Sequence, residues 1–231
     1  MNKKAKKYLL DIVEGGYEKI ASDFSETRKK PMKPMVYKIV GDLDIKPEDS
    51  VLDLGCGNGC FFEVLGGKGN YLGLDNSAKL IALAEEEYKT NFKKFDIIKL
   101  DELKENNFNF IFSWAVFHHI PGKKLRLNFL QEVYKNLNPE GSFVFSVWKL
   151  RNRKDFYKLA FKTFFNNLFQ GKIMDWADLI FPWKGSPKKF QPPRYYHAFS
   201  KKSLEKEIKK SSFKIEKFLE DDFNYYLILK K

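Results

Sequence analysis

The sequence has few cysteines and no long apolar run, and both absences exclude classes of protein. Among 231 residues only Cys56 and Cys60 are cysteines, in a glycine-rich stretch without histidine or cysteine partners at metal-ligand spacing. We expect free thiols in a reducing cytoplasm, and no bound metal. No apolar run reaches the roughly 18–20 residues of a membrane span. The basic segment 1–7 is followed by a stretch broken by Asp11 and Glu14, unlike a signal peptide, so we expect a cytoplasmic protein without a membrane partner.

Arginine is also scarce, with only five among the 42 basic residues, and the formal net charge is +12. A lysine bias of this kind can come from an AT-rich genome, so the sum alone indicates little. Its distribution is more informative. Residues 51–150 have 12 basic and 12 acidic side chains, whereas residues 151–202 have 12 basic and three acidic ones. A neutral middle followed by a basic segment indicates a surface for a polyanion.

Short apolar segments alternate with helical patterns from residue 50 onward. With 43% apolar residues, the chain can form a core in spite of its charge. Helical spacing is clear in residues 78–88 and 123–137. Strands are predicted around these helices, at residues 51–54, 71–75, 92–95, 108–113 and 142–147. Because strand and helix alternate, the sheet is predicted to be parallel, with helices on both faces.

The end of the chain departs from this alternation. A helix is predicted over residues 201–211, followed by strands at 213–219 and 225–230, whose link is too short for a parallel crossover. We therefore predict an α/β fold of the class I methyltransferase (Rossmann-like) type, with seven strands, one of them antiparallel. The chain is interpreted as a single domain, 1–231, with an N-terminal helical extension, 1–45, and a basic aromatic insertion, 151–199.

A glycine-rich loop follows the first predicted strand and is a strong chemical signal. Gly55, Gly57 and Gly59 are spaced too tightly for the dinucleotide fingerprint, whose third glycine would fall at Cys60. Glycines there let the backbone approach a ligand at the C-terminal edge of the sheet. Asp75 ends the second strand, where its carboxylate can accept both hydroxyls of a ribose. Together these residues predict a site for S-adenosylmethionine, which has no pyrophosphate.

Two further acids are candidates for the same cofactor site. Asp96, at the end of the third strand, is the candidate acceptor for the adenine amino group, with Ile97 beside the ring. Asp101 is a rival, and either acid could instead cap a loop. Asp53, inside the first strand, is expected to bond the loop's own amides, as a structural acid or one next to the ligand.

Several motifs outside the glycine loop form a recognisable set. They are Tyr17-x-x-Ile20-Ala21-x-x-Phe24-Ser25-x-Thr27-Arg28, Ser113-x-Ala115-Val116-x-His118-His119, Val147-Trp148 and Arg194-Tyr195-Tyr196-His197-x-Phe199. With the loop, this set resembles the tRNA methyltransferases that esterify 5-carboxymethyluridine at the wobble position, including the methyltransferase domain fused to the AlkB-type tRNA hydroxylase. The resemblance spans nearly the whole chain and implies that Ser113 and Ala115 also contact the cofactor. Asn109, Trp114 and Cys60 depart from the family pattern, and Trp114 borders the expected reaction pocket.

The resemblance implies that the group to be methylated is a carboxylate. Because a carboxylate is ionised at neutral pH, its methylation requires no general base. It requires in-line positioning and a cation that orients the oxygen. Arg28 and Arg194 stand in family motifs and offer the planar fork that a carboxylate accepts. We hypothesise that one of them holds the carboxymethyl group, with His118 or His119 in the same cleft. The alternative for the two histidines is a polar turn that caps a helix.

Basic and aromatic residues toward the C-terminus are candidates for RNA binding. A surface for the phosphates of a tRNA anticodon loop is expected from Arg151, Arg153 and Lys154 with the lysines at 158, 162, 184, 188, 189, 201 and 202. Tyr195, Tyr196 and His197 either stack on an unpaired base or pack in the core. The aromatic residues interleaved with the basic ones, among them Phe161 and Trp176, are interpreted as the core of the insertion.

Two other functions remain open from the sequence. A small-molecule methyltransferase with the same cofactor site would have a closed apolar pocket and no affinity for RNA. A non-catalytic RNA-binding or scaffold subunit would have a ruined cofactor site, which the intact glycines and Asp75 argue against. The resemblance also implies a small zinc-binding activator that pairs with the edge strand at residues 92–95. Lysines in that strand also discourage pairing, so the sequence leaves the activator open.

Overall fold

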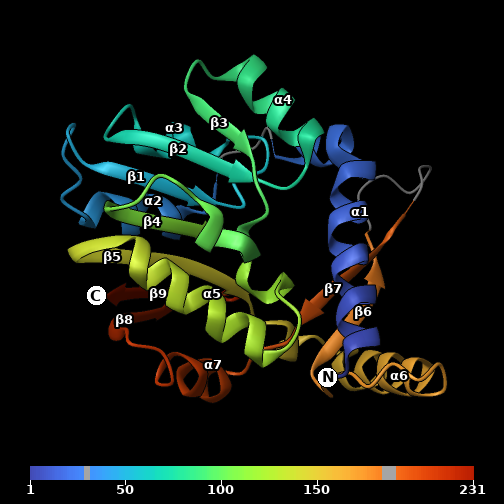
Figure 1. Cartoon of the computed structure of the whole chain (residues 1–231). Helices are drawn as coiled ribbons and strands as arrows, with labels where there is room; N and C mark the ends of the chain where they lie inside the picture. The colour runs from blue at the N-terminus through green and yellow to red at the C-terminus, as the bar shows by residue number, and fades with distance from the viewer. Residues whose placement is uncertain (29–31, 184–190) are drawn as a thin grey trace.

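The computed structural model describes residues 1–28, 32–183 and 191–231. A seven-stranded sheet in the order β3-β2-β1-β4-β5-β9-β8 forms its centre (Figure 1). The strands are β1 (Ser50–Leu54), β2 (Asn70–Asp75), β3 (Asn91–Lys94), β4 (Phe108–Trp114), β5 (Leu137–Trp148), β8 (Lys214–Glu220) and β9 (Asn224–Lys230). β9 runs antiparallel to both of its neighbours, whereas the pairs among β1 to β5 are parallel. The predicted fold class is therefore confirmed.

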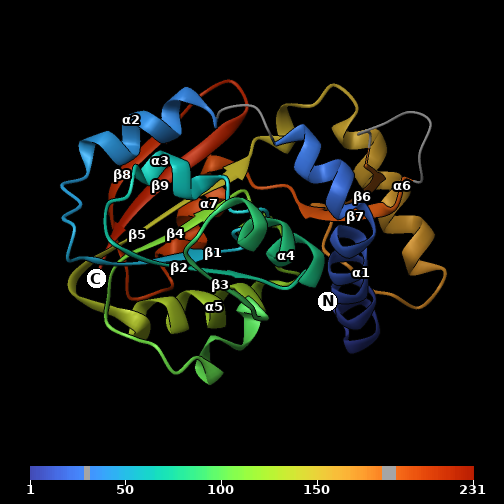
Figure 2. The ribbon, with the colours of Figure 1, turned by 90° about the horizontal axis from the view of Figure 1, so that it is seen from above.

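Helices cover both faces of the sheet, because strand residues alternate between two apolar clusters (Figure 2). In β5, Phe143 and Phe145 belong to one cluster and Val144 to the other. The cluster of Val144 includes residues of α2 (Pro34–Asp42), α3 (Phe61–Leu65) and α4 (Ala78–Glu87). The opposite cluster includes residues of α5 (Lys123–Asn136), α7 (Lys201–Ile208) and the 3-10 helix η1 (Ile97–Glu102).

Most element boundaries agree with the sequence pattern to within a few residues, and two differ more. β5 begins before the predicted residue 142, because Leu137 already pairs with Phe108 ahead of a bulge. Helix α7 ends at Ile208 rather than 211, and Ser211 N donates to the carbonyl oxygen of Ile208 in the turn that follows.

Helix α1 (Lys3–Thr27) lies at the edge of the sheet to which β1, β2 and β4 point with their C-terminal ends (Figure 1). Its N-cap, Asn2, accepts a hydrogen bond from Ala5 N at 2.9 Å. Farther along, Glu18 accepts from the Ser77 hydroxyl at 2.7 Å, which ties α1 to the N-terminus of α4. The helical extension therefore closes the sheet edge at which α/β proteins bind ligands.

The described parts of the segment 151–199, residues 151–183 and 191–199, lie beside the main sheet, on the outer side of α1. They contain α6 (Phe156–Leu168) and an antiparallel pair, β6 (Asp178–Pro182) and β7 (Pro193–His197), and β7 packs on α1 (Figures 1 and 2). Phe161 is 55% exposed and Trp176 is 41% exposed, so the interpretation of these two rings as core is wrong. Lysines 184, 188 and 189 lie outside the described residues. Within the described ranges, no helix is both long and apolar enough to cross a membrane.

Candidate active site

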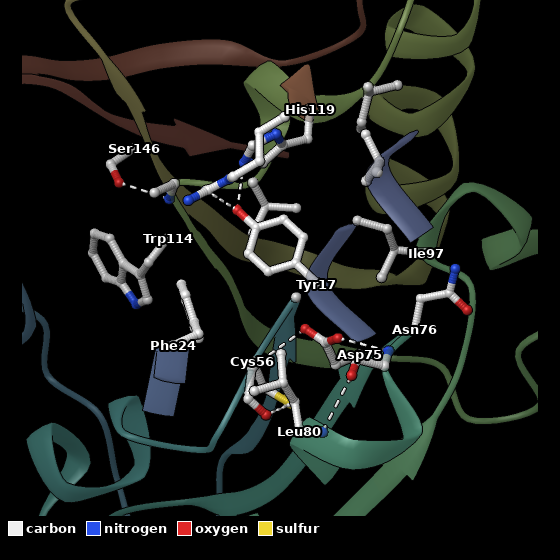
Figure 3. Close-up of a pocket in the computed structure, with 18 of the residues that line it drawn as sticks. Tyr17, Phe24, Cys56, Asp75, Asn76, Leu80, Ile97, Trp114, His119 and Ser146 are labelled. Atoms are coloured by element: carbon white, nitrogen blue, oxygen red, sulfur yellow. Dashed lines mark hydrogen bonds between the residues drawn. The ribbon is translucent and has the colours of Figure 1, made fainter. Parts of the chain in front are cut away.

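A cavity of about 1120 Å³ lies between helix α1 and the C-terminal edge of the main sheet (Figure 3). The loop after β1, the end of β2, the start of η1 and the segment after β4 line it on the sheet side. Most residues predicted for cofactor and reaction line this one cavity, namely Arg28, Asp53, Gly55, Gly57, Asp75, Asp96, Ile97, Ala115, His119 and Arg194. Gly59, Ser113 and His118 are not part of its lining.

The glycine loop is held in a turn that needs glycine. Gly55 has φ +77° and donates its N–H to Leu74 O of β2 at 2.7 Å. A Cβ atom at Gly55 would lie 2.4 Å from a side-chain carbon of Val116, in the segment after β4. Gly59, also at positive φ, has its Cβ position filled by the Phe92 ring at 2.8 Å. Gly55 and Gly59 therefore shape the loop through packing and backbone conformation.

Asp75 is oriented by backbone amides at the end of β2. Gly57 N donates to one carboxylate oxygen and Ser77 N to the other, each at 2.9 Å. Burial raises the pKa of Asp75, and these amides lower it in part. Each oxygen keeps a further lone pair for a ligand hydroxyl, so the residue fits the acceptor role predicted for it.

Asp53 differs from the expectation in its partner. Its carboxylate accepts from the Tyr71 hydroxyl at 2.9 Å, whereas the loop amide of Gly57 goes to Asp75. The expectation that Asp53 bonds the loop's own amides was therefore wrong. Burial raises the pKa of Asp53 to about 7, and the nearby charge of Asp75 adds to the effect. Asp53 nonetheless lines the cavity beside the loop.

Asp96 is the better placed of the two rival acids. It lines the cavity together with Ile97, and its side chain accepts from Ile98 N at 3.1 Å as the cap of η1. Asp101 is exposed and stands outside this cavity. An apolar wall at Ile97 with a carboxylate next to it has the chemistry that binds an adenine ring with an amino group.

Ala115 and Ser113, two neighbours in one motif, differ in position. Ala115 lines the cavity with φ +58°, and its N–H donates to the Ser146 hydroxyl at 3.0 Å. Ser113 is fully buried and donates to Leu54 O at 3.1 Å. Ser113 therefore links β4 to β1 behind the cavity wall, and its predicted contact with the cofactor would have to be indirect.

Among the described residues, the guanidinium of Arg194 has aromatic rings around it and no carboxylate partner. Its Cζ lies 4.6 Å from the ring centre of Tyr17, 5.1 Å from that of Tyr196 and 5.8 Å from that of Trp148. The residue is 5% exposed, donates one N–H to the Tyr17 hydroxyl, and has no hydrogen-bond partner for Nε among the described residues. Burying a cation that no carboxylate in the described residues neutralises costs free energy. An anion bound in the cavity next to Arg194 would offset this cost.

His119 is fixed in one neutral tautomer. Its Nδ1 donates to Tyr195 O at 2.7 Å, so its Nε2 accepts from the Tyr17 hydroxyl at 2.9 Å (Figure 3). Burial and the neighbouring Arg194 lower the pKa of His119 to about 3. The imidazole is therefore uncharged at neutral pH and orients Tyr17, which in turn accepts from Arg194.

The other two predicted catalytic residues, His118 and Arg28, lie at the margins of the cavity, one behind its wall and the other at its exposed end. His118 is fully buried, accepts from Trp148 N at 3.2 Å and packs on Trp148 and Tyr196 behind the wall. Arg28 is exposed at the end of α1, with its guanidinium 4.9 Å from the Phe24 ring centre. Of the two candidate arginines, Arg194 is thus the buried one and Arg28 stands at the rim. No group of three or more metal-ligating side chains is assembled in the described parts of the chain.

Two aromatic residues of the site, Tyr17 and Trp148, were not predicted as site residues, whereas Trp114 was expected to border the pocket. Tyr17 and Trp148 stand in the quoted motifs, but nothing in their spacing shows that both rings meet Arg194. Trp114 lines the cavity and has a buried Nε1–H without a partner in the described residues. Figure 3 shows Trp114 and Ile97 on opposite sides of Tyr17. An unpaired donor in the wall is a signal that only the folded chain reveals.

The three residues predicted to stack on a base are buried. Tyr195, Tyr196 and His197 are 0%, 1% and 5% exposed. On one side of β7, the Tyr195 hydroxyl and His197 Nδ1 both donate to a buried oxygen of Asp178, each at 2.9 Å. On the other side, Tyr196 stacks on Trp148. Their assignment to RNA binding is therefore wrong as a direct contact, and packing, the other reading, is what the structure has.

Arg151 and Lys154 of the predicted basic surface are exposed and Arg153 is half-buried, and both arginines have partners within the chain. Arg151 donates from Nε to Ala198 O at 2.9 Å, and Arg153 forms a two-pronged ion pair with Asp155 at 2.8 and 2.9 Å. Lys154 is exposed. None of these three lines the cavity.

Comparison with known proteins agrees with this geometry. A family model described as a methyltransferase domain matches residues 52–145. The tRNA (carboxymethyluridine(34)-5-O)-methyltransferase of Schizosaccharomyces pombe is 29% identical over 97% of this chain and 98% of its own length. The tRNA (carboxymethyluridine(34)-5-O)-methyltransferase ALKBH8 of Mus musculus is 31% identical over 61% of this chain, which corresponds to 21% of that protein. The chain therefore spans nearly all of the first relative and about a fifth of the second.

A solved structure supports the fold independently. The SAM-dependent methyltransferase of Methanosarcina mazei superposes with a TM-score of 0.65 at 20% identity, covering 87% of this chain and 99% of that one. With the strand order, the glycine loop and the acid after β2, this defines a class I methyltransferase that uses S-adenosylmethionine. Within that class, the chain is similar over almost its whole length to the tRNA wobble-uridine methyltransferase of Schizosaccharomyces pombe, as its motifs predict.

Proposed function

We propose that this protein transfers a methyl group from S-adenosylmethionine to the carboxylate of 5-carboxymethyluridine at the wobble position of tRNA. The observation that carries the proposal is Arg194, a 5% exposed cation without a carboxylate partner in the described residues, in the wall of the cofactor cavity. A substrate carboxylate would supply the missing anion, and guanidinium binds carboxylate through two parallel hydrogen bonds. The similarity to two tRNA (carboxymethyluridine(34)-5-O)-methyltransferases supports the choice of tRNA.

The residues around Arg194 suit a reaction in which no proton is removed. S-Adenosylmethionine supplies a methyl group on a positively charged sulfur, and a carboxylate is already a nucleophile at neutral pH. His119 has a pKa lowered to about 3 and both ring nitrogens engaged, so it holds Tyr17 and Arg194 in position. The rings of Tyr17, Tyr196 and Trp148 exclude water from the guanidinium, which strengthens its interaction with an anion.

The test uses purified protein, S-adenosylmethionine and tRNA from a host that makes 5-carboxymethyluridine but lacks this gene. Mass spectrometry of the digested nucleosides is expected to show a methyl ester, which mild alkali returns to the acid. Free 5-carboxymethyluridine nucleoside is the matched small-molecule substrate, and we expect far slower turnover with it. A methyl group that survives alkali, or equal turnover of nucleoside and tRNA, would contradict the proposal.

A partner at the sheet edge stays a separate prediction. β3 is an edge strand of the main sheet, and two of its four residues are Lys93 and Lys94. The zinc-binding activator implied by the resemblance would add a strand there. The test compares the methylation rate of the chain purified alone with that of the chain isolated from its host together with any bound partner. Equal rates would show that no activator is required.

A further inference from the structure

The cavity continues beyond Arg194 along the N-terminal half of α1. About two side chains per turn of this half line it, in a stripe that includes Lys3, Lys6, Lys7, Asp11, Glu14 and Tyr17. Across from the stripe, the lining includes Ile97 and Ile98 of η1 and the pair Ile120 and Pro121 before α5. The outer end of this groove is basic, and its inner end is the reaction centre.

The side chains of the three lysines at the outer end have no partner in the chain. Lys3, Lys6 and Lys7 are exposed, and in the described parts of the chain none of their side-chain ammonium groups has a hydrogen bond or an ion pair. Lys4, on the same helical turn, points elsewhere and donates to Gln170 O at 2.9 Å. Free cations that line a cavity are better placed to bind a ligand's anions than Arg151 or Arg153, which already have partners in the chain.

We propose that the N-terminal half of α1 is the entry groove for the RNA, with Lys3, Lys6 and Lys7 binding backbone phosphates next to the target nucleotide. This inference rests on the proposed function, because it assumes that the substrate is tRNA. Lysines neutralise phosphates without reading sequence, which suits an anticodon loop held by its backbone while one base enters the cavity.

The dimensions of the helix set which phosphates are in reach. At 1.5 Å per residue, Lys7 lies about 15 Å and Lys3 about 21 Å along α1 from Tyr17. The lysines therefore contact phosphates of neighbouring nucleotides rather than that of the target. Asp11 and Glu14 lie between them and Tyr17. Their carboxylates can accept from ribose 2′-hydroxyls or base N–H groups but repel phosphate, so the backbone must lie over the lysine end.

The experiment compares two triple variants of the full-length chain with the same change in net charge. The test variant is Lys3→Glu, Lys6→Glu and Lys7→Glu, and the control is Lys38→Glu, Lys68→Glu and Lys89→Glu, three exposed lysines away from the cavity. Binding of a fluorescent anticodon stem-loop is titrated over a series of salt concentrations. We expect the test variant to bind about 10-fold or more weakly at low salt, with a log–log salt slope flatter by about 2. The control and the single variant Lys4→Glu should resemble wild type.

Two readouts separate the possible failures. Binding of S-adenosylmethionine without RNA should be unchanged in the test variant, which shows that the cofactor site is folded. If wild type esterifies tRNA and the test variant binds and esterifies it equally well, the groove is refuted while the proposed function stands. An equal loss in test and control variants also refutes the groove, because only net charge would then matter. If wild type modifies no tRNA, the proposed function itself fails.

Discussion

The two buried arginines of this fold allow a matched test of whether Arg194 belongs to the substrate or to the structure. Arg126, on α5, is 1% exposed and forms a two-pronged ion pair with Glu207 of α7, at 2.7 and 2.8 Å. Arg194 is 5% exposed and has no carboxylate partner in the described residues. Methionine has a similar length and no charge, so Arg126→Met and Arg194→Met remove the same cation from two different surroundings.

The expected effects on stability are opposite in kind. Removing Arg126 leaves the Glu207 carboxylate buried and unpaired, which costs about 3–5 kcal/mol. At roughly 2–4 °C per kcal/mol for a chain of this size, Tm should fall by about 10 °C. Removing Arg194 relieves an uncompensated buried cation while it loses ring contacts and one hydrogen bond to Tyr17. These terms oppose each other, so we expect stability within about 1 kcal/mol of wild type.

The expected effects on activity are the reverse. Two charge-assisted hydrogen bonds to the substrate carboxylate contribute at least about 3 kcal/mol. Arg194→Met should therefore lower kcat/KM on tRNA by about 100-fold or more, with the affinity for S-adenosylmethionine unchanged. Arg194→Lys keeps the charge but lacks the planar fork of the guanidinium, so its kcat/KM should lie between those of wild type and Arg194→Met. Circular dichroism melts and methyl-ester assays measure the two effects. A loss of stability in Arg194→Met equal to that of Arg126→Met would show that Arg194 is a structural cation and would refute the reasoning.

Four further predictions follow from three groups of the cavity, namely Trp114, His119 and Asp53. Trp114→Phe keeps a ring but removes the unpaired Nε1–H, so affinity for the cofactor or for tRNA should fall about 5–10-fold, the value of one hydrogen bond; unchanged titrations of both ligands would contradict this. The kcat of Asp53→Asn, which lacks the cavity carboxyl with a pKa of about 7, should be flat from about pH 6 to 9, because no general base is required. An inflection near 6.5 in this variant would contradict a neutral His119. The pKa of His119 is lowered to about 3. Its contribution to the free energy of unfolding is therefore present above its ordinary pKa and is lost as pH falls from about 6.5 toward 3. Urea denaturation at a series of pH values measures this loss. The raised pKa of Asp53, about 7, has the opposite sign: its contribution is present at low pH and is lost as pH rises through 7, so Asp53→Asn should gain stability over wild type at pH 8 but not at pH 4.

The cofactor site was predictable because it is local in sequence. The glycine loop and Asp75 are the C-terminal ends of adjacent parallel strands, and parallel pairing alone brings these ends together. The loop amide of Gly57 indeed reaches the Asp75 carboxylate. The error at Asp53 has the opposite origin, because its partner Tyr71 sits on the neighbouring strand at a register that the sequence does not fix.

The sequence could not predict which residues of β7 face the cavity, because it did not show that this segment is a strand. In a strand, neighbours point to opposite faces, which sends Arg194 and Tyr196 toward the cavity side and Tyr195 and His197 toward Asp178. Asp178 is distant in sequence and has no motif of its own. The motif therefore divides into a half on the cavity side, with Arg194 and Tyr196, and an anchoring half, with Tyr195 and His197.

The residues that line the cavity come from different segments of the chain. The match to the methyltransferase domain family covers residues 52–145, which include the glycine loop, Asp75 and His119. Arg194 and Tyr17, which meet at the centre of the cavity, come from the insertion and from α1, outside that match. We therefore expect the core to determine the cofactor and the flanking segments to determine what is methylated. Substitutions at Arg194 should change substrate turnover without changing cofactor affinity, and a chain with the same core and a different insertion should methylate something else.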